Sequence, residues 1–238
     1  MSGIIWHNLT FAAAAVFLVL MIYRIVSIIR QPVHLRWELA PIPHEKGKAK
    51  YGGSYLEDYE WWQKPRKKSR IAPVIYMLTE IFVLKSIWKN NRSLWPLSLS
   101  MHTGLYLIIL TLVLYFINAL LMIGEASLSV QNVFLSITTV VVAAGCVLGV
   151  LGTVGLILKR SIDTSLRNFG TFSTYFRLVL LAAVFISGVT AMLYPGNYAL
   201  EMSLFVKGII TLDSGITVTA ASAVHILISM LFVIYLPF

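Results

Sequence analysis

Two histidines lie within long apolar stretches of the sequence, where ionisable side chains are rare. His102 comes about one turn into the second stretch, and His225 lies in the fifth. A functional role is the default expectation for such residues, and neutral imidazole is the usual axial ligand of low-spin haem. Gly104 and the small residues at 220–223 leave room for a porphyrin face. On chemistry alone, an alternative role is as well supported as haem ligation: each histidine would form a hydrogen bond across a helix interface.

The elements that must position these histidines are membrane-spanning helices. Of 238 residues, 58% are hydrophobic and only 12% are charged, whereas a soluble domain has roughly a quarter of its residues charged. A helix needs about 20 apolar residues to cross the hydrocarbon core. Five stretches are long enough, at 11–29, 97–122, 133–158, 172–194 and 216–236. The sequence therefore predicts an all-α membrane protein with five transmembrane helices.

The basic residues predict the orientation of these helices. Thirteen of the 19 Lys and Arg fall between Arg30 and Arg92, and three more lie between the third and fourth stretches. Basic loops face the cytoplasm, so the N-terminus is expected outside and the C-terminus inside the cytoplasmic membrane. The net charge of +9 is thus interpreted as a topology signal, with no nucleic-acid partner expected.

Three regions follow from this topology. Residues 1–30 form the first transmembrane helix, residues 31–96 form a long cytoplasmic loop, and residues 97–238 form a four-helix membrane domain. Within the loop, Ile71, Val74 and Leu78 recur at helical spacing. They predict an amphipathic helix over 71–89 that lies on the membrane surface. Trp61 and Trp62 predict either a docking surface for a partner or an aromatic belt at the bilayer.

Depth separates the two histidines. His102 is expected near the cytoplasmic face, and His225 lies about 12 residues before Pro237, roughly 18 Å from the inner end at about 1.5 Å per residue. Their depths then differ by roughly 12 Å. Two ligands of one iron, each bound at about 2 Å, would be nearly level. Two haems at different depths, each with another ligand, are therefore predicted.

Other residues bear on the same chemistry. Arg24 and Arg177, near the cytoplasmic ends of the first and fourth helices, could pair with haem propionates, although snorkelling to the interface is the plainer interpretation. Gly149 and its neighbours on the third helix favour close helix packing over a macrocycle groove. Cys146 is the only cysteine, so a cysteine-ligated iron–sulfur cluster must belong to a partner.

The chain resembles the cytochrome b subunits related to the gamma subunit of respiratory nitrate reductase. Within that group it is most similar to the membrane subunits of sulfate-reducer and heterodisulfide-reductase-like redox complexes. The resemblance rests on the loop sequences at 36–39, 43–45, 51–55, 61–62 and 64–66. It also rests on His102-Thr103-Gly104 and on His225 followed by Pro237-Phe238.

The resemblance implies one or two b haems and menaquinone as cofactors. His102 would ligate the cytoplasmic-side haem and His225 the outer haem. The related pattern has a second histidine ten residues after the first, where this chain has Leu112. The other missing ligand would lie just past Phe238, as if the record were truncated. His7, at the outer end of the first helix, is one alternative outer ligand.

The function expected from this resemblance is electron transfer between menaquinone and a cytoplasmic iron–sulfur subunit. That partner would resemble the catalytic subunit of heterodisulfide reductase, and other membrane or periplasmic redox subunits could join it. The chain would be the electron-transfer subunit of an oxidoreductase complex, with quinone oxidoreductase activity expected. The alternative is a non-redox membrane anchor for a cytoplasmic complex. A transport subunit is disfavoured, because no acidic residue lies deep in the five stretches.

Overall fold

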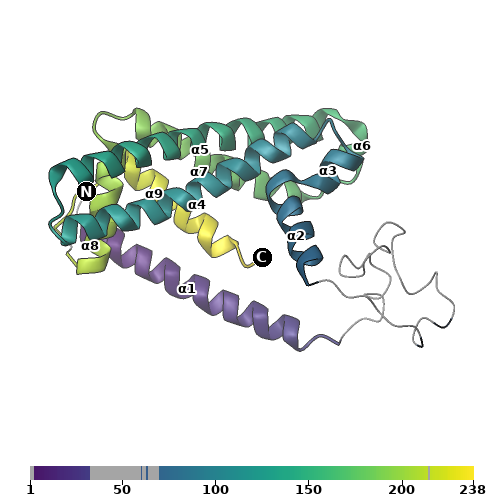
Figure 1. Cartoon of the computed structure of the whole chain (residues 1–238), viewed down its shortest axis with the longest axis horizontal. Coiled ribbons are helices and arrows are strands. Elements are labelled where there is room, and N and C mark those ends of the chain that lie inside the picture. The colour runs from purple at the N-terminus through teal and green to yellow at the C-terminus, as the bar shows by residue number, and fades with distance from the viewer. Residues whose placement is uncertain (1–2, 33–59, 61–62, 64–69, 214) are drawn as a thin grey trace. The chain divides into compact units, whose positions relative to one another are not determined.

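The computed structural model describes residues 3–32, 60, 63, 70–213 and 215–238, and the regular structure in these ranges is entirely helical (Figure 1). The chain divides into two compact units, one made of Met1–Ile25 and Pro96–Phe238 and the other of Val26–Trp95. The helices are α1 (Gly3–Ile29), α2 (Ile71–Val83), α3 (Lys85–Asn90), α4 (Trp95–Ile123), α5 (Leu128–Ile162), α6 (Thr164–Asn168), α7 (Phe172–Leu193), α8 (Tyr198–Thr211) and α9 (Ala220–Tyr235).

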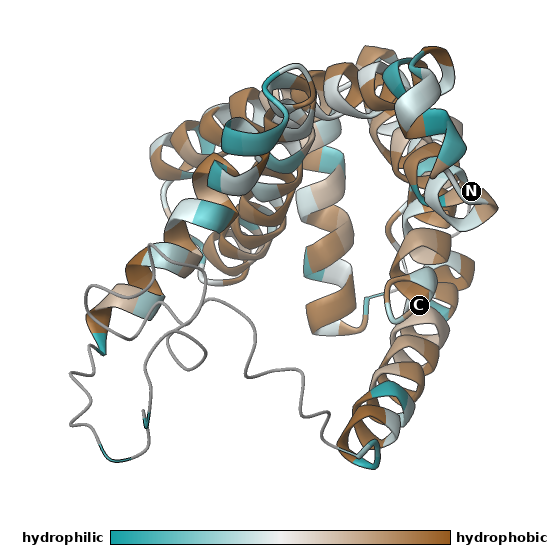
Figure 2. Ribbon diagram, turned by 90° about the vertical axis from the view of Figure 1, so that its right-hand side faces the viewer, coloured by the Kyte–Doolittle hydropathy of each residue, from teal (hydrophilic) through white to brown (hydrophobic). Residues whose placement is uncertain are grey.

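Four helices, α1, α4, α5 and α7, are long and apolar enough to cross a membrane. Hydrophobic residues cover most of their length in Figure 2. The chain is thus a multi-pass membrane protein. The fifth predicted span differs from expectation, because α9 has only 16 residues, about 24 Å at 1.5 Å per residue. Residues 216–219, predicted to belong to this helix, precede it without helical structure.

Glycines bring α4 and α5 into direct backbone contact. A Cβ atom built on Gly104 would lie 2.6 Å from the backbone nitrogen of Gly149, and one built on Gly152 would overlap the backbone nitrogen of Met101. The hydroxyl of Ser100 also donates to the Leu148 carbonyl at 2.8 Å. Small residues permit this close approach in a membrane, and the predicted use of the α5 glycines in helix packing is confirmed.

Helix α5 also packs against α7, which in turn packs against α9. The ring of Phe185 fills the space beside Gly149, where a built Cβ would overlap it. Gly188 lies against both the Cys146 sulfur and the His225 ring. The buried core of the larger unit therefore runs from α5 through α7 to the helix that carries His225.

Hydrogen bonds from Glu201 of α8 stabilise the N-terminus of α9. The Glu201 carboxylate accepts hydrogen bonds from the Thr219 amide and hydroxyl and from the Ser222 hydroxyl, the last at 2.9 Å. Thr219 is itself the N-cap of α9 and accepts from the Ser222 amide. A carboxylate at a helix N-terminus satisfies unpaired donors and complements the helix dipole. This contact fixes where the shortened helix begins.

The smaller unit contains two helices where one was predicted over 71–89. Leu84 adopts a left-handed conformation (φ 51°) and separates α2 from α3. The Glu80 carboxylate accepts from the amide and hydroxyl of Ser86, at 3.0 and 2.8 Å, and so caps α3 across the break. The Trp95 indole nitrogen donates to the Val83 carbonyl at 2.7 Å. Hydrogen bonds on both sides of Leu84 thus stabilise the break between α2 and α3.

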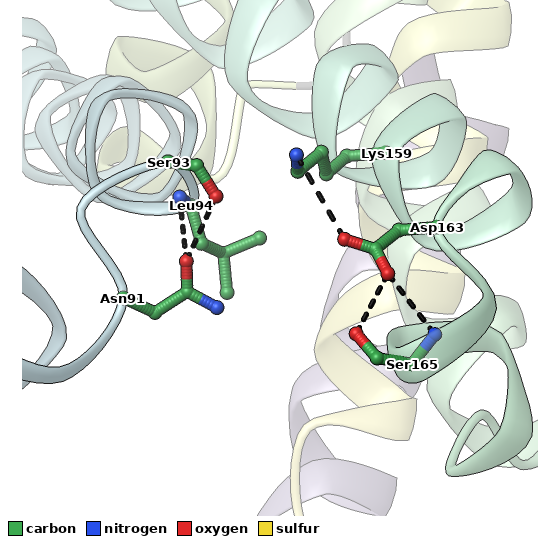
Figure 3. A network of polar contacts seen from close by, with 6 residues as sticks. All are labelled: Asn91, Ser93, Leu94, Lys159, Asp163 and Ser165. Atoms are coloured by element: carbon green, nitrogen blue, oxygen red, sulfur yellow. Dashed lines mark hydrogen bonds and ion pairs between the residues drawn. The ribbon is translucent and has the colours of Figure 1, made fainter.

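Two polar clusters at helix ends are drawn in Figure 3, one from each unit. In the smaller unit, Asn91 accepts from the Ser93 hydroxyl and the Leu94 amide. In the larger unit, Asp163 caps α6 by accepting from the Ser165 amide and hydroxyl, at 3.0 and 2.6 Å. These hydrogen bonds hold the pKa of the Asp163 carboxyl below its usual value. The clusters end their helices in polar turns, as segments that leave a bilayer require.

Candidate functional site

A cavity of about 280 Å³ lies within the larger unit, between α1, α4, α8 and α9. Its walls are largely apolar, with a few hydroxyl, thioether and imidazole groups among them. This combination is typical of sites for small molecules and cofactors. The lining residues are Thr10, Ala13, Ala14, Leu112, Tyr115, Tyr198, Met202, Phe205, Val206, His225, Ile226, Ser229, Met230 and Val233.

His225 is held in a defined orientation on the α9 wall of this cavity. Its Nδ1 lies 2.9 Å from the Ser187 hydroxyl, and that hydroxyl lies 3.0 Å from the Val184 carbonyl. The single hydroxyl proton is donated to the carbonyl, so the serine oxygen accepts from Nδ1–H. Nε2 then carries the lone pair, since a neutral imidazole has one donor and one acceptor nitrogen.

Leu112 lies on the α4 wall of the same cavity. The resemblance pairs this position with His225, and the structure brings the two residues to one space. His102 precedes Leu112 by ten residues on α4, about 15 Å along the helix axis. His102 and His225 therefore lie at different levels, in agreement with the depth expected from the sequence.

Tyr115 contributes a buried hydroxyl to the cavity. The side chain is 5% exposed, and its oxygen has no hydrogen-bond partner among the described residues. The polar neighbour of this hydroxyl is Tyr198, with which it interacts through the two side-chain oxygens. The Tyr198 ring lies edge-on to His225, at 6.1 Å between ring centroids.

His102 is also oriented by a hydrogen bond. Its Nδ1 lies 2.7 Å from the Ser98 carbonyl, one turn earlier in α4. A carbonyl only accepts, so Nδ1 is the donor and Nε2 carries the lone pair. Metal-bound histidines usually have this arrangement, in which the second ring nitrogen donates to a carbonyl or carboxylate. His102 lies outside the cavity that contains His225.

The remaining predicted site residues lie apart from this cavity. Gly104 faces the backbone of α5, which occupies the space predicted for a porphyrin. Arg24 is exposed near the end of α1. Arg177 donates to the Phe238 carbonyl at 3.2 Å and lines a smaller cavity of about 170 Å³ between α7 and α9. The loop sequences that carry the resemblance, with Trp61 and Trp62, lie outside the described residues.

His7, the proposed alternative ligand, is buried against α8. It is 4% exposed, its ring centroid lies 5.3 Å from that of Phe205, and it contacts the position of Gly208. Its Nε2 has no hydrogen-bond partner within the described part of the chain. Phe205 lines the cavity whereas His7 does not. The histidine thus contacts a residue of the cavity wall without lining the cavity itself.

The donor set and size of the His225 cavity do not fit a six-coordinate haem. His225 offers one nitrogen, and Leu112 offers no donor. A cavity of about 150 Å³ binds benzene, a ratio of roughly 25 Å³ per heavy atom. At that ratio 280 Å³ accommodates roughly eleven atoms, against about forty in haem b. At His102 the anchored imidazole offers one ligand nitrogen, while the α5 backbone packs against the neighbouring Gly104.

Sequence analysis did not identify Tyr115, Ser187 or the cap formed by Glu201. Tyr115 follows Leu112 by three residues and so shares its helix face, which was the available signal. Ser187 and Glu201 act across helices that are distant in sequence, and no local pattern indicates such contacts. Comparison of the chain with protein-family models, with curated proteins and with solved structures finds no match.

Proposed function

We propose that this chain is the haem b subunit of a respiratory complex in the cytoplasmic membrane. It would pass electrons between menaquinone and a cytoplasmic iron–sulfur subunit. In this proposal the chain has five spans, with α9 as the fifth and the N-terminus outside. The distribution of basic residues supports this orientation, because Arg30–Arg92 holds thirteen of them and the outer loops hold only Lys207.

The observation that carries the proposal is the anchored imidazole of His102. Within a long apolar helix, its Nδ1 is committed to the Ser98 carbonyl at 2.7 Å, which leaves Nε2 as a ligand nitrogen. An imidazole that served only to join helices would direct its donor to a neighbouring helix instead. His102 would hold haem b at the cytoplasmic end of α4, and the bound haem would supply one-electron transfer.

The partner is proposed from chemistry that the chain lacks. Cys146 is the only cysteine and is buried, so an iron–sulfur cluster has to be carried by another subunit. The basic cytoplasmic loop would dock that subunit, which resembles the catalytic subunit of heterodisulfide reductase. Other membrane or periplasmic redox subunits would complete the complex.

The test is the amount of haem b per chain, measured as the pyridine haemochrome of protein purified from membranes, with a dithionite-reduced difference spectrum. We expect one haem per chain in the natural protein. His102→Ala removes the ligand nitrogen and should abolish the haem signal. His225→Ala, the matched control on another helix, should retain it.

Other results would change the proposal in defined ways. A preparation without haem would leave the chain as a membrane anchor for a cytoplasmic complex. Two haems per chain, one lost in each histidine variant, would restore the expectation of an outer haem at His225. Haem retained in His102→Ala would remove that residue from the site.

A further inference from the structure

We propose that α3 and the turn after it bind the head group of an anionic phospholipid, while α2 lies in the acyl boundary of the same leaflet. Both helices belong to the smaller unit, Val26–Trp95. Neither haem nor a redox partner is needed for this binding. The break at Leu84 gives the two helices separate roles: an apolar anchor before it and a cationic head-group site after it.

Three cationic side chains occupy one face of α3 and the turn that follows it. Lys85 and Lys89 lie one helix turn apart, on the face that also carries Trp88. The Arg92 guanidinium lies over the Trp88 ring, 5.0 Å from its centroid. All three cations are exposed, and none has a carboxylate partner among the described residues. Uncompensated cations on one face attract a phosphate, whose oxygens accept charge-assisted hydrogen bonds.

Two tryptophans indicate the depth of these cations in the membrane. The rings of Trp88 and Trp95 meet edge to face, with centroids 4.7 Å apart. The Trp95 indole nitrogen donates to the Val83 carbonyl at 2.7 Å, which fixes that ring, and Trp88 is 44% exposed. Tryptophan favours the level of the lipid head groups, where its apolar ring is buried and its N–H remains hydrated. At that level the three cations meet lipid phosphates.

Helix α2 presents apolar side chains on its exposed surface. None of its residues is buried, and Ile71, Val74, Ile75 and Leu78 are each at least 44% exposed. These four recur at helical spacing and so share one face. The single charged residue of α2, Glu80, directs its carboxylate to the start of α3. A helix of this kind is stable with its apolar face about 5–10 Å deep in the boundary between head groups and acyl chains.

The short connection from α3 to α4 favours lipid over a soluble protein as the occupant. Helix α3 ends at Asn90, and α4, which is long and apolar enough to cross a membrane, begins at Trp95. Five residues span at most about 18 Å when fully extended. The Leu94 amide also donates to the Asn91 carbonyl at 3.2 Å, so this connection is folded into a turn. Helix α3 is therefore tethered within reach of the head groups.

The experiment is photolabelling of the full chain in nanodiscs with a diazirine derivative of phosphatidylglycerol, followed by mapping of the labelled peptides. Label should fall on the peptide at 85–95, and unlabelled phosphatidylglycerol should displace it about fivefold or more better than phosphatidylcholine does. One cation near an anionic surface contributes roughly a fivefold preference. Lys85→Gln/Lys89→Gln should therefore reduce labelling of this peptide roughly five- to twenty-five-fold. Both lysines are exposed, so the variant should fold.

Lys159→Gln/Arg167→Gln is the matched control, because it removes the same charge from the connection between α5 and α7; the peptide at 85–95 should label as in the natural protein. Equal loss in both variants, equal displacement by the two lipids, or displacement by inorganic phosphate would overturn the head-group site.

The depth of α2 is measured separately, with a nitroxide attached to Ile75→Cys in the same nanodiscs. The only native cysteine, Cys146, is buried and should remain unlabelled. We expect the nitroxide to collide more often with oxygen, which concentrates in the bilayer, than with a water-soluble nickel complex. More frequent collisions with the nickel complex would place α2 in water, reject the acyl-boundary anchor and favour a protein as the occupant of its apolar face.

Discussion

At the residue scale, each membrane histidine is oriented by a hydrogen bond to an oxygen atom. For His102 this oxygen lies one helix turn away, and for His225 it lies on a neighbouring helix. Ser98 anchors His102 and Ser187 anchors His225, each through Nδ1. In each ring the nitrogen left with the lone pair is Nε2. Both histidines therefore present Nε2 as a ligand nitrogen. A backbone carbonyl anchors the ring of His102, and a serine hydroxyl anchors the ring of His225.

Ser187→Ala tests this anchoring. The substitution removes the Ser187 oxygen that accepts from the buried Nδ1–H of His225, whose other acceptor is the Val184 carbonyl, and the loss of one hydrogen bond costs about 0.5–1.5 kcal/mol. We expect the free energy of unfolding, measured by denaturant titration in mixed micelles, to fall by that amount. Ser136→Ala is the control, because the exposed Ser136 hydroxyl bonds only to a carbonyl of its own helix. An equal decrease in the two variants would contradict the anchoring role.

Part of the site could be predicted from the sequence. His102 and His225 stand out because ionisable residues are rare in apolar segments, and helix rise alone places them at different depths. Tyr115 does not stand out, since a tyrosine in an apolar helix is compatible with ordinary packing. Its buried position beside Tyr198 becomes visible only when α8 and α9 are in place.

At the element scale, the effect of replacing a glycine by alanine at the α4–α5 contact depends on which atoms the added methyl group would meet. On Gly104 it would meet the backbone of Gly149 and Gly145, at 2.6 to 2.9 Å. On Gly155 its closest neighbour, at 2.5 Å, would be the tip of the flexible Leu97 side chain. The backbone cannot move without separating the helices, whereas the leucine can change its rotamer.

We therefore expect Gly104→Ala to lower the free energy of unfolding by about 1–3 kcal/mol, the usual cost of overpacking, and Gly155→Ala to have a much smaller effect. Thermal unfolding in detergent, followed by circular dichroism, compares the two identical substitutions. Similar melting temperatures for both variants would show that α4 and α5 do not depend on backbone contact at Gly104.

Element boundaries were predictable where they follow hydrophobicity and not where they follow a distant contact. The four long apolar helices correspond to predicted spans. The break at Leu84 was not expected, because a left-handed leucine has no signature in the sequence and its stabilising contact comes from Glu80. The late start of α9 similarly depends on Glu201 in another helix.

At the scale of the whole molecule, the number of crossings decides on which sides the termini lie. Four crossings place both termini on one side, and five place them on opposite sides. Helix α9 is shorter than the roughly 20 residues that usually span the hydrocarbon core, although local thinning of the bilayer accommodates short helices at a modest cost.

We expect five crossings. A reporter active only in the cytoplasm, fused after Phe238, should be active, and the same reporter fused before Met1 should be inactive. A periplasmic reporter at each end provides the converse control. Cytoplasmic activity at both ends, or at neither, would show that α9 does not cross the membrane.

The hydrogen bond between Asn118 and Thr138 bears on how the chain is inserted during synthesis. The Asn118 amide donates to the Thr138 hydroxyl at 2.9 Å, and both side chains are almost fully buried between α4 and α5. A lone asparagine entering lipid would carry its amide unpaired. If α4 and α5 leave the translocon together as a helical hairpin, the Asn118 NH2 group has its acceptor on entry. The short connection from Gly124 to Ser127 suits this paired release, so we expect α4 and α5 to enter the bilayer as one insertion unit.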